Sequence, residues 1–185
     1  MRFLKIISLG VAAIYLTGCG YVTSNYGASP DNVERIRSVG DVKVSVSEFS
    51  SSTGNKRTSI GCRAAGPVSN PEGKSFEDYI HDAFINDLKM AGIYADGAEI
   101  SISGTIESLD FNSNIGAGKW VIKTRVESSV SQGYVVEAIH EFSTNWVADK
   151  ACQQVAQAFE PAVESLISKI VNHADFKGLV SGEKI

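Results

Sequence analysis

Three consecutive segments in the second half of the chain alternate apolar and polar residues with a period of two. They span residues 98–109, 119–128 and 134–146. Such alternation is typical of β-strands that bury only one face, and strands of this kind are usually antiparallel neighbours. Their apolar face must be covered by a second layer. The residues expected on the buried face are Ile100, Ile102, Gly104, Ile106, Trp120, Ile122, Thr124, Val126, Val136, Ala138, His140, Phe142 and Thr144.

Two amphipathic segments can supply that second layer. Residues 75–91 carry apolar side chains at spacings of three and four, which predicts a helix. Its first residue is a serine that can cap the first turn, and Gly92 supplies the left-handed stop. Residues 150–172 form a second apolar stripe. Because Pro161 lacks a backbone N–H, we expect this helix to kink or break near Ala158.

A further strand is predicted ahead of the first helix. Residues 41–49 alternate valines with polar residues, and a long polar loop over residues 50–74 follows them. The element order is therefore strand, long loop, helix, three strands, helix. We predict an α+β fold, a two-layer sandwich with two main helices on a mostly antiparallel four-stranded sheet.

The N-terminus has the three-part layout of a secretory signal peptide. Arg2 and Lys5 are followed by an uncharged apolar run that ends at Leu16, and small residues then precede Cys19. The run is too short to span a bilayer, because a transmembrane helix needs about 20 apolar residues. Cleavage is therefore predicted rather than a membrane span.

The tetrad Leu16-Thr17-Gly18-Cys19 resembles the bacterial lipobox position by position. The resemblance implies a lipoprotein whose mature chain begins at Cys19 and is anchored there by diacylglycerol and a further acyl chain such as palmitate. An ordinary signal peptide with an incidental cysteine is the alternative. In enteric-type lipoproteins an aspartate after the lipidated cysteine favours the inner membrane, so Gly20 implies the outer membrane, facing the periplasm. The inner membrane and the cell surface remain open alternatives.

Composition along the chain predicts a single domain. Residues 1–18 form the signal peptide, and residues 19–38, rich in Ser, Asn, Gly and Tyr, are expected to be the lipidated N-terminus and a flexible tether. Residues 39–177 have the usual size of one α+β domain, here periplasmic. Residues 178–185 are expected to form a loosely held tail.

With Cys19 assigned to lipid, Cys62 and Cys152 remain as an even pair. Disulfides persist in the oxidising periplasm, so a bond between these two cysteines is predicted. It would close a loop of about 90 residues and stabilise the fold by roughly 3–5 kcal/mol. The alternative is two separate buried thiols.

Charge argues against a nucleic-acid partner. Without Arg2 and Lys5 the 17 basic residues fall to 15 against 21 acidic ones, so the mature net charge is −6. The only local basic cluster is Lys56, Arg57 and Arg63, which is expected to be solvated rather than an anion site.

The sequence contains no recognisable catalytic constellation. It has no nucleophile elbow, no phosphate-binding glycine loop and no H-E-x-x-H helix. His81, His140 and His173 fall on three different predicted elements, without carboxylates or cysteines at metal-ligand spacing. No metal, no cofactor and no enzymatic activity are therefore predicted.

Two short segments resemble a group of small envelope lipoproteins. The helix end and turn at 88–94 and the strand Ile100-Ser101-Ile102-Ser103-Gly104-Thr105-Ile106 are similar to the AG-x-Y turn and I-x-I-x-G-x-I strand of YajG-like and lipopolysaccharide-assembly-type outer-membrane lipoproteins. The resemblance implies a βαβββα order and action by binding rather than catalysis. It carries over no binding residue.

The leading functional hypothesis is a membrane-anchored, non-catalytic binding or assembly module. Its partners would be the membrane, through the lipid on Cys19, and an envelope protein or component docked on the long loop or an exposed sheet edge. One alternative is a carrier of a lipid or other amphiphile in a groove between helices and sheet, which Trp120 and Trp146 could line. Aromatic residues on strands that bury one face more often belong to the core, so we expect both tryptophans there. Another is a thiol-dependent periplasmic enzyme that uses Cys62 or Cys152.

Overall fold

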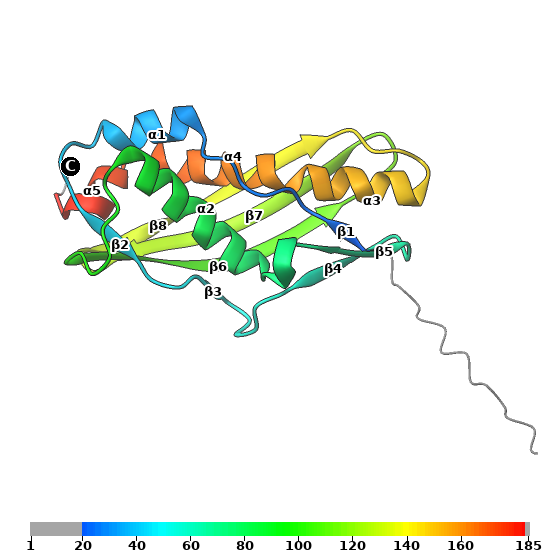
Figure 1. Ribbon diagram of the computed structural model, residues 1–185, viewed down its shortest axis with the longest axis horizontal. Helices are drawn as coiled ribbons and strands as arrows, with labels where there is room; N and C mark the ends of the chain where they lie inside the picture. The colour runs from blue at the N-terminus through cyan, green and yellow to red at the C-terminus, as the bar shows by residue number, and fades with distance from the viewer. Residues whose placement is uncertain (1–19, 184–185) are drawn as a thin grey trace, which may run out of the picture.

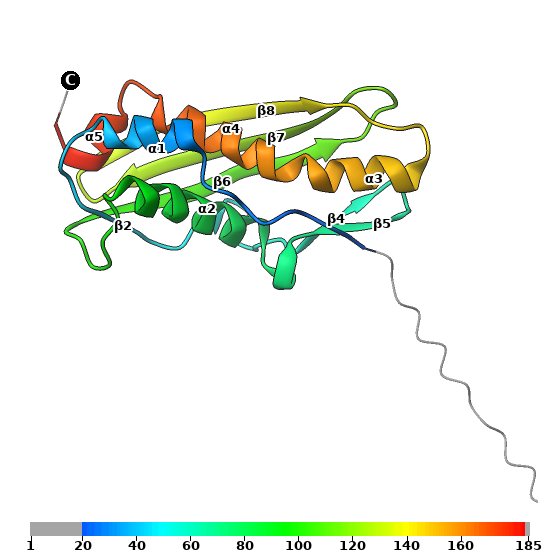
Figure 2. The same cartoon turned by 45° about the horizontal axis from the view of Figure 1, so that its top comes forward.

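The computed structural model describes residues 20–183. The predicted signal peptide and Cys19 lie outside the described residues. The described chain forms two sheets, with helices over one face of the larger sheet (Figures 1 and 2). The predicted α+β class is thus confirmed.

The three alternating segments form the body of the larger sheet. They are the strands β6 (Ile100–Asn112), β7 (Gly118–Ser128) and β8 (Ser131–Phe142), and each is antiparallel to the next. On the other side of β6 lie two short parallel strands, β2 (Val44–Val46) and β3 (Ser50–Ser51). The sheet therefore has five strands rather than the predicted four, because the chain continues along β6 after β2 instead of leaving it as a loop.

The buried face of this sheet largely follows the predicted alternation. Most of the predicted residues are buried, but Ile100, His140 and Phe142 are only partly so. A register shift between Ile106 and Ser108 interrupts the alternation in β6 and turns Leu109 into the core. The residues confirmed as buried are Ile102, Gly104, Ile106, Trp120, Ile122, Thr124, Val126, Val136, Ala138 and Thr144.

Gly104 has a packing role within the alternating strand β6. A Cβ at this position would lie 2.6 Å from ring atoms of Phe49, which is fully buried. The absence of a side chain at Gly104 therefore lets the Phe49 ring lie directly against the β6 backbone.

The predicted helices form with the expected boundaries. Helix α2 (Phe76–Ala91) is capped by Ser75, whose hydroxyl accepts the Asp78 N–H, and Gly92 ends it at a φ of 83°. The second predicted helix is divided into α3 (Ala148–Gln157) and α4 (Phe159–Val171). The break near Ala158 is thus confirmed. Pro161 lies in the first turn of α4, where a missing N–H is tolerated.

Aromatic side chains fill the space between the helices and the larger sheet. The ring of Trp120 lies 4.8 Å from that of Phe159, and the Phe159 ring lies 5.0 Å from that of Phe76. All three side chains are fully buried. The indole N–H of Trp120 donates to the Val155 carbonyl (2.9 Å), so its one polar group is satisfied.

Part of the predicted long loop is folded into a second, smaller sheet. Strands β4 (Ser59–Cys62) and β5 (Gly66–Ser69) form a hairpin, and a 3₁₀ turn, η1 (Pro71–Gly73), leads to α2. The hairpin turn places Arg63 and Ala64 at positive φ, 45° and 55°. Glycine or asparagine normally marks such turns, so no hairpin could be predicted at Arg63 and Ala64.

The expectation of a flexible tether over residues 19–38 is wrong for its described part. Strand β1 (Tyr21–Val22) pairs parallel to β5, and helix α1 (Pro30–Arg37) buries Val33 and Ile36. The prediction was based on the low apolar content of this segment. The segment is nevertheless ordered, because it pairs with residues far away in the sequence.

The expectation of a loosely held tail is also corrected, because the chain after residue 175 forms helix α5 (Phe176–Ser181). This helix buries Phe176, Leu179 and Val180. The Ser128 hydroxyl at the end of β7 donates to the Leu179 carbonyl (2.8 Å). The folded domain therefore spans residues 20 to about 182.

Candidate functional site

The described chain begins at one end of the elongated molecule, on the right in Figure 1. Here the Tyr21 hydroxyl donates to Asp149 Oδ1 (2.8 Å), which places the chain start beside the first turn of α3. We call this region the anchor end. It comprises Gly20, Tyr21 and Val22, the turn 63–65, the loops 113–117 and 143–147, and the first turn of α3. Cys19 directly precedes it in the sequence.

Arg63 joins three parts of the anchor end. Its Nε donates to Ser113 Oγ (3.0 Å) and its Nη1 to the Asn145 carbonyl (3.0 Å). The β4–β5 turn is thereby fixed to the loops at the ends of β6 and β8. The Arg63 guanidinium is therefore used in holding the fold together.

The predicted basic cluster does not come together as one site. Lys56 pairs with Asp78 and Glu48 at 2.6 and 3.4 Å. The Arg57 guanidinium donates to the Leu109 carbonyl, and Arg63 belongs to the anchor end. Because each cation has its own protein partner, these residues do not form a shared anion site.

Cys62 and Cys152 form the predicted disulfide, with an S–S distance of 2.05 Å. Both residues are buried, Cys62 at the end of β4 and Cys152 in α3. The bond ties the smaller sheet, which holds β1, to the helical layer. While it is intact, neither sulfur is a thiolate nucleophile.

The two tryptophans have opposite environments. Trp120 is fully buried, whereas Trp146 is 77% exposed in the loop between β8 and α3. The expectation that both belong to the core is therefore wrong for Trp146, because β8 ends at Phe142 and its alternation no longer sets the side-chain direction there. Ile115 and Val22, 75% and 60% exposed, lie at the same end.

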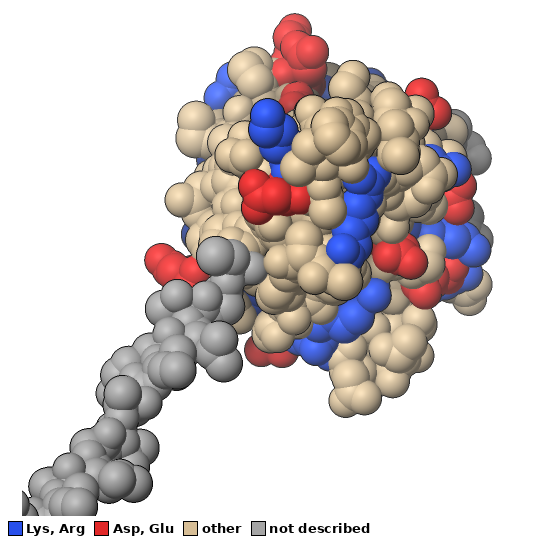
Figure 3. All heavy atoms as spheres, turned by 90° about the vertical axis from the view of Figure 1, so that its right-hand side faces the viewer, with Lys and Arg blue, Asp and Glu red and all other residues tan. Residues whose placement is uncertain are grey.

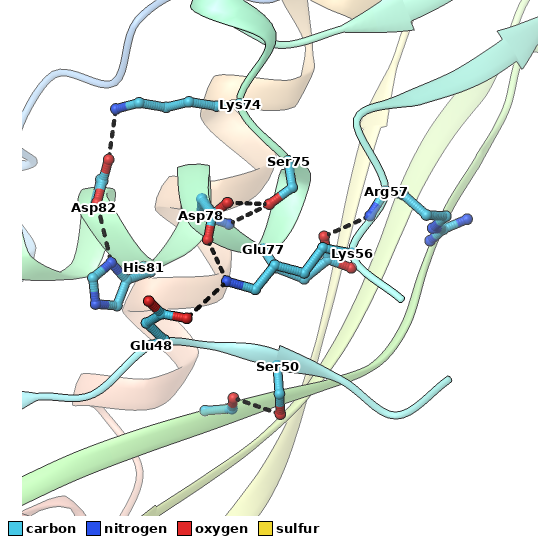
Figure 4. Close-up of polar contacts among 11 residues, drawn as sticks. Glu48, Ser50, Lys56, Arg57, Lys74, Ser75, Glu77, Asp78, His81 and Asp82 are labelled. Carbon is cyan, nitrogen blue, oxygen red and sulfur yellow. Dashed lines mark hydrogen bonds and ion pairs between the residues drawn. The ribbon is translucent and has the colours of Figure 1, made fainter. Parts of the chain in front are cut away.

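A second group of polar residues covers the side of α2 that faces the β3–β4 segment (Figure 4). The Glu77 carboxylate accepts the Arg57 backbone N–H (3.0 Å), and Lys74 pairs with Asp82 (2.6 Å). Burial alone would raise the pKa of Asp78, but hydrogen bonds from Lys56 and Ser75 outweigh it and hold this pKa below its ordinary value. This group therefore fastens the β3–β4 segment to α2.

His81 has the partners of a catalytic base but not the accessibility. Its Nδ1 lies 3.1 Å from Asp82 Oδ1, as in an acid–histidine pair. Its Nε2 is buried without a hydrogen-bond partner, and the ring packs edge-on against Phe49 at 5.7 Å. A substrate cannot reach this nitrogen in the structure.

The other two histidines belong to different parts of the fold from His81, which is on α2. His140 is on β8, and the His173 ring stacks on Tyr134 at 3.8 Å. Within residues 20–183 no group of three or more His, Cys, Asp or Glu side chains is arranged to hold a metal ion. Over the same residues, no helix has the length and apolarity needed to cross a bilayer.

An open groove of about 420 Å³ runs along α2. Asn25, Glu72, Lys74, Asp82 and Lys89 are among its lining residues. These polar side chains alternate with Tyr26, Tyr79, Ala83 and Ile85, and the groove is open to the surface instead of being enclosed between the helices and the larger sheet. It does not match the apolar pocket expected of an amphiphile carrier.

A buried carboxylate, Asp87, holds α1 against α2. Its oxygens accept hydrogen bonds from the Tyr26 hydroxyl (2.9 Å), the Ser29 N–H (3.2 Å) and the Asn32 amide (3.3 Å). The Ser29 hydroxyl in turn donates to Glu164 on α4 (2.7 Å). Burial raises the pKa of Asp87 above its ordinary value.

The raised pKa of Asp87 predicts a pH-dependent stability. At pH values between the ordinary pKa of Asp87 in the unfolded chain and its higher pKa in the folded protein, the folded protein binds more protons than the unfolded one. The free energy of unfolding should therefore fall as the pH rises through that window and level off above it. An Asp87→Asn variant should lack this contribution. Urea unfolding of both proteins across mildly acidic pH measures it, and equal slopes would contradict the prediction.

Strand β8 is the open edge of the larger sheet. Among the described strands it pairs with β7 alone, and Figure 2 shows it along the upper rim. Its register with β7 is continuous from Tyr134 to Phe142. Glu137 and Glu141 lie opposite Lys123 and Lys119, on the sheet face away from the core, and Ile139 between them is 51% exposed.

Comparison with known proteins identifies a fold and no family. No family model matches the chain, and no curated protein matches it significantly. It is similar in structure to protein XCC0632 from Xanthomonas campestris, of family DUF330, with a TM-score of 0.54 and 12% identity, over 86% of this chain and 96% of that one. The hypothetical protein CT253 from Chlamydia trachomatis gives 0.49 and 10%, over 78% and 100%. At such identities the first likeness concerns the fold alone.

Proposed function

We propose that the protein is a lipid-anchored lipoprotein of the outer membrane that faces the periplasm and acts as a non-catalytic binding or assembly module. The lipobox supports the anchor, and the exposed β8 edge supports the binding role. The observation that carries the proposal is that β8 has an uninterrupted register from Tyr134 to Phe142 with a strand on one side only.

An open strand edge presents unpaired backbone N–H and C=O groups, which an extended peptide can complete. Natural proteins commonly protect such edges with prolines, bulges or a covering segment. The register shift at the start of β8 ends before Tyr134, so the remainder is free of bulges. The proposed occupant is an extended segment of an envelope protein, added to the sheet beside β8.

The two alternative functions have less support. An amphiphile carrier needs an apolar cavity between helices and sheet, and Trp120, Phe76 and Phe159 fill that space. A thiol enzyme needs a free cysteine, and Cys62 is bonded to Cys152. Neither alternative therefore has a formed site among the described residues.

A site-specific crosslinking experiment tests the binding role. A photoreactive amino acid placed at Glu137 or Glu141 of the full-length protein, expressed in its own cell envelope, is expected to capture one defined envelope protein. The same amino acid at Glu34, an exposed position on α1, is the matched control. Crosslinks at Glu34 equal to those on β8, or none at either β8 position, would contradict the proposal.

A further inference from the structure

We infer that the anchor end is itself a membrane-contacting surface, on which Trp146 and Ile115 enter the lipid–water interface beside the lipidated cysteine. This inference rests on the proposed lipid anchor at Cys19. It adds a defined orientation. The long axis of the domain rises from the bilayer, and β8 runs along this axis, so most of the strand lies away from the membrane surface (Figure 1).

The chain between the lipidated cysteine and the folded domain is very short. Only Gly20 separates Cys19 from β1, and consecutive Cα atoms are about 3.8 Å apart. Strand β1 is fixed by its pairing with β5, by the Thr23 N–H bonded to the Ser69 carbonyl (2.9 Å), and by the Thr23 hydroxyl bonded to Asn70 (2.8 Å). A lipid on Cys19 therefore holds this end of the domain at the membrane surface.

The exposed apolar side chains gather at the anchor end. Among residues 20–183, the large apolar side chains with the greatest exposure are those of Trp146, Ile115 and Val22, and all three belong to the anchor end. Met90 and Val130, which are less exposed, lie in the last turn of α2 and in the β7–β8 turn, at the opposite end (Figure 1). Apolar exposure is therefore greatest where the chain would meet lipid.

The loops 113–117 and 143–147 form one fixed surface. The Gly116 N–H donates to the Thr144 carbonyl (3.2 Å), and the Thr144 hydroxyl donates to the Asn114 carbonyl. Arg63 bonds to both loops, as described above. Trp146 and Ile115 are thus presented together, and no large ordering entropy opposes their contact with a bilayer.

The chemistry of this surface suits the headgroup region of a membrane. Tryptophan concentrates at lipid–water interfaces because its ring is apolar and its N–H is polar. Figure 3 shows this end face-on, largely uncharged, with Lys and Arg side chains across its middle and Asp and Glu side chains beside them and towards the rim. Lys119 and Lys150 lie in or next to the segments that form this end, together with Glu141 and Asp149. The surface therefore carries both signs of charge, and its attraction to a bilayer comes chiefly from the exposed apolar side chains.

The two tryptophans make the inference directly measurable. The protein with its lipid, confirmed by intact mass, is inserted into vesicles of phosphatidylethanolamine and phosphatidylglycerol that contain lipid brominated near the headgroup end of the acyl chains. Trp146 emission is expected to shift to the blue and to lose most of its intensity to the bromine. A Trp146→Phe variant isolates Trp120, whose buried emission should be unaffected by brominated lipid.

A matched probe at the opposite end provides the control. Met90→Trp in the Trp146→Phe protein places an exposed indole far from the anchor, and it is expected to stay unquenched. A lipidated protein in which Trp146 is quenched no more than the residue-90 probe would overturn the inference and leave the anchor intact. Membrane-purified protein whose mass lacks the lipid would overturn the anchor itself, before any vesicle is prepared.

Discussion

Serine in place of Cys19, in a chain exported by an ordinary cleavable signal peptide, is expected to move the protein from the membrane to the soluble periplasmic fraction. Each buried acyl methylene contributes about 0.8 kcal/mol, and two or more chains give a stable anchor that the variant lacks. No described helix can replace it. The contact made by Trp146 and Ile115 is too small to hold the protein alone. Fractionation followed by intact mass measures the effect.

The control for this prediction is the Cys62→Ser, Cys152→Ser protein with its own signal peptide. It retains Cys19 and should remain in the membrane fraction. If the Cys19→Ser protein instead stayed membrane-bound after washing with high salt, a second anchor would have to exist and the lipobox interpretation would be wrong. Salt matters because it releases proteins held only by headgroup charge.

The second large effect is expected from removing the disulfide. Replacing Cys62 and Cys152 with serine should lower the free energy of unfolding by roughly 3–5 kcal/mol, because the bond closes a loop of 90 residues in the unfolded chain. Urea unfolding of the soluble Cys19→Ser form, with and without the two further substitutions, measures the difference. Reductant should destabilise the disulfide-containing form to the same extent.

The same variant also tests the arrangement of the anchor end. Hydrogen exchange should accelerate first in β4, β5 and β1, because the bond fastens this small sheet to α3. A loss below about 1 kcal/mol would contradict the stability prediction, since it would imply that the loop is already closed by other contacts when the chain unfolds. A defined enzymatic activity that disappears on oxidation would favour the thiol-enzyme alternative.

Local patterns were sufficient for strands β6, β7 and β8 and for helices α2, α3 and α4, but not for strand β3 or for helices α1 and α5. The period-two alternation identified the buried face of β7 at Trp120, Ile122 and Val126, because a strand turns successive side chains to opposite sides. Ser75, Gly92 and Pro161 located helix ends because capping and a missing N–H act within one turn. Such signals fail where a bulge changes the phase, as it does after Ile106.

The candidate site was only partly foreseeable. The Cys62–Cys152 pair followed from counting cysteines in an oxidising compartment. Trp146 was expected in the core, because its segment was treated as a continuation of β8. The role of Arg63 could not be predicted, since its partners Ser113 and Asn145 come from loops with no pattern of their own.

The sequence alone predicted a secretory address with Cys19 as its candidate anchor, and it determined the alternating strands and amphipathic helices that need one another. Only tertiary contacts determined that residues 20–37 and 50–74 form ordered strands and helices. Tyr26 and Ser29 find a buried acceptor in Asp87, and β1 finds its partner in β5. These contacts join segments roughly 45 to 60 residues apart. Because a local pattern records only neighbours within a turn or a pleat, only the folded chain shows that Gly20, the residue after Cys19, leads directly into a fixed surface.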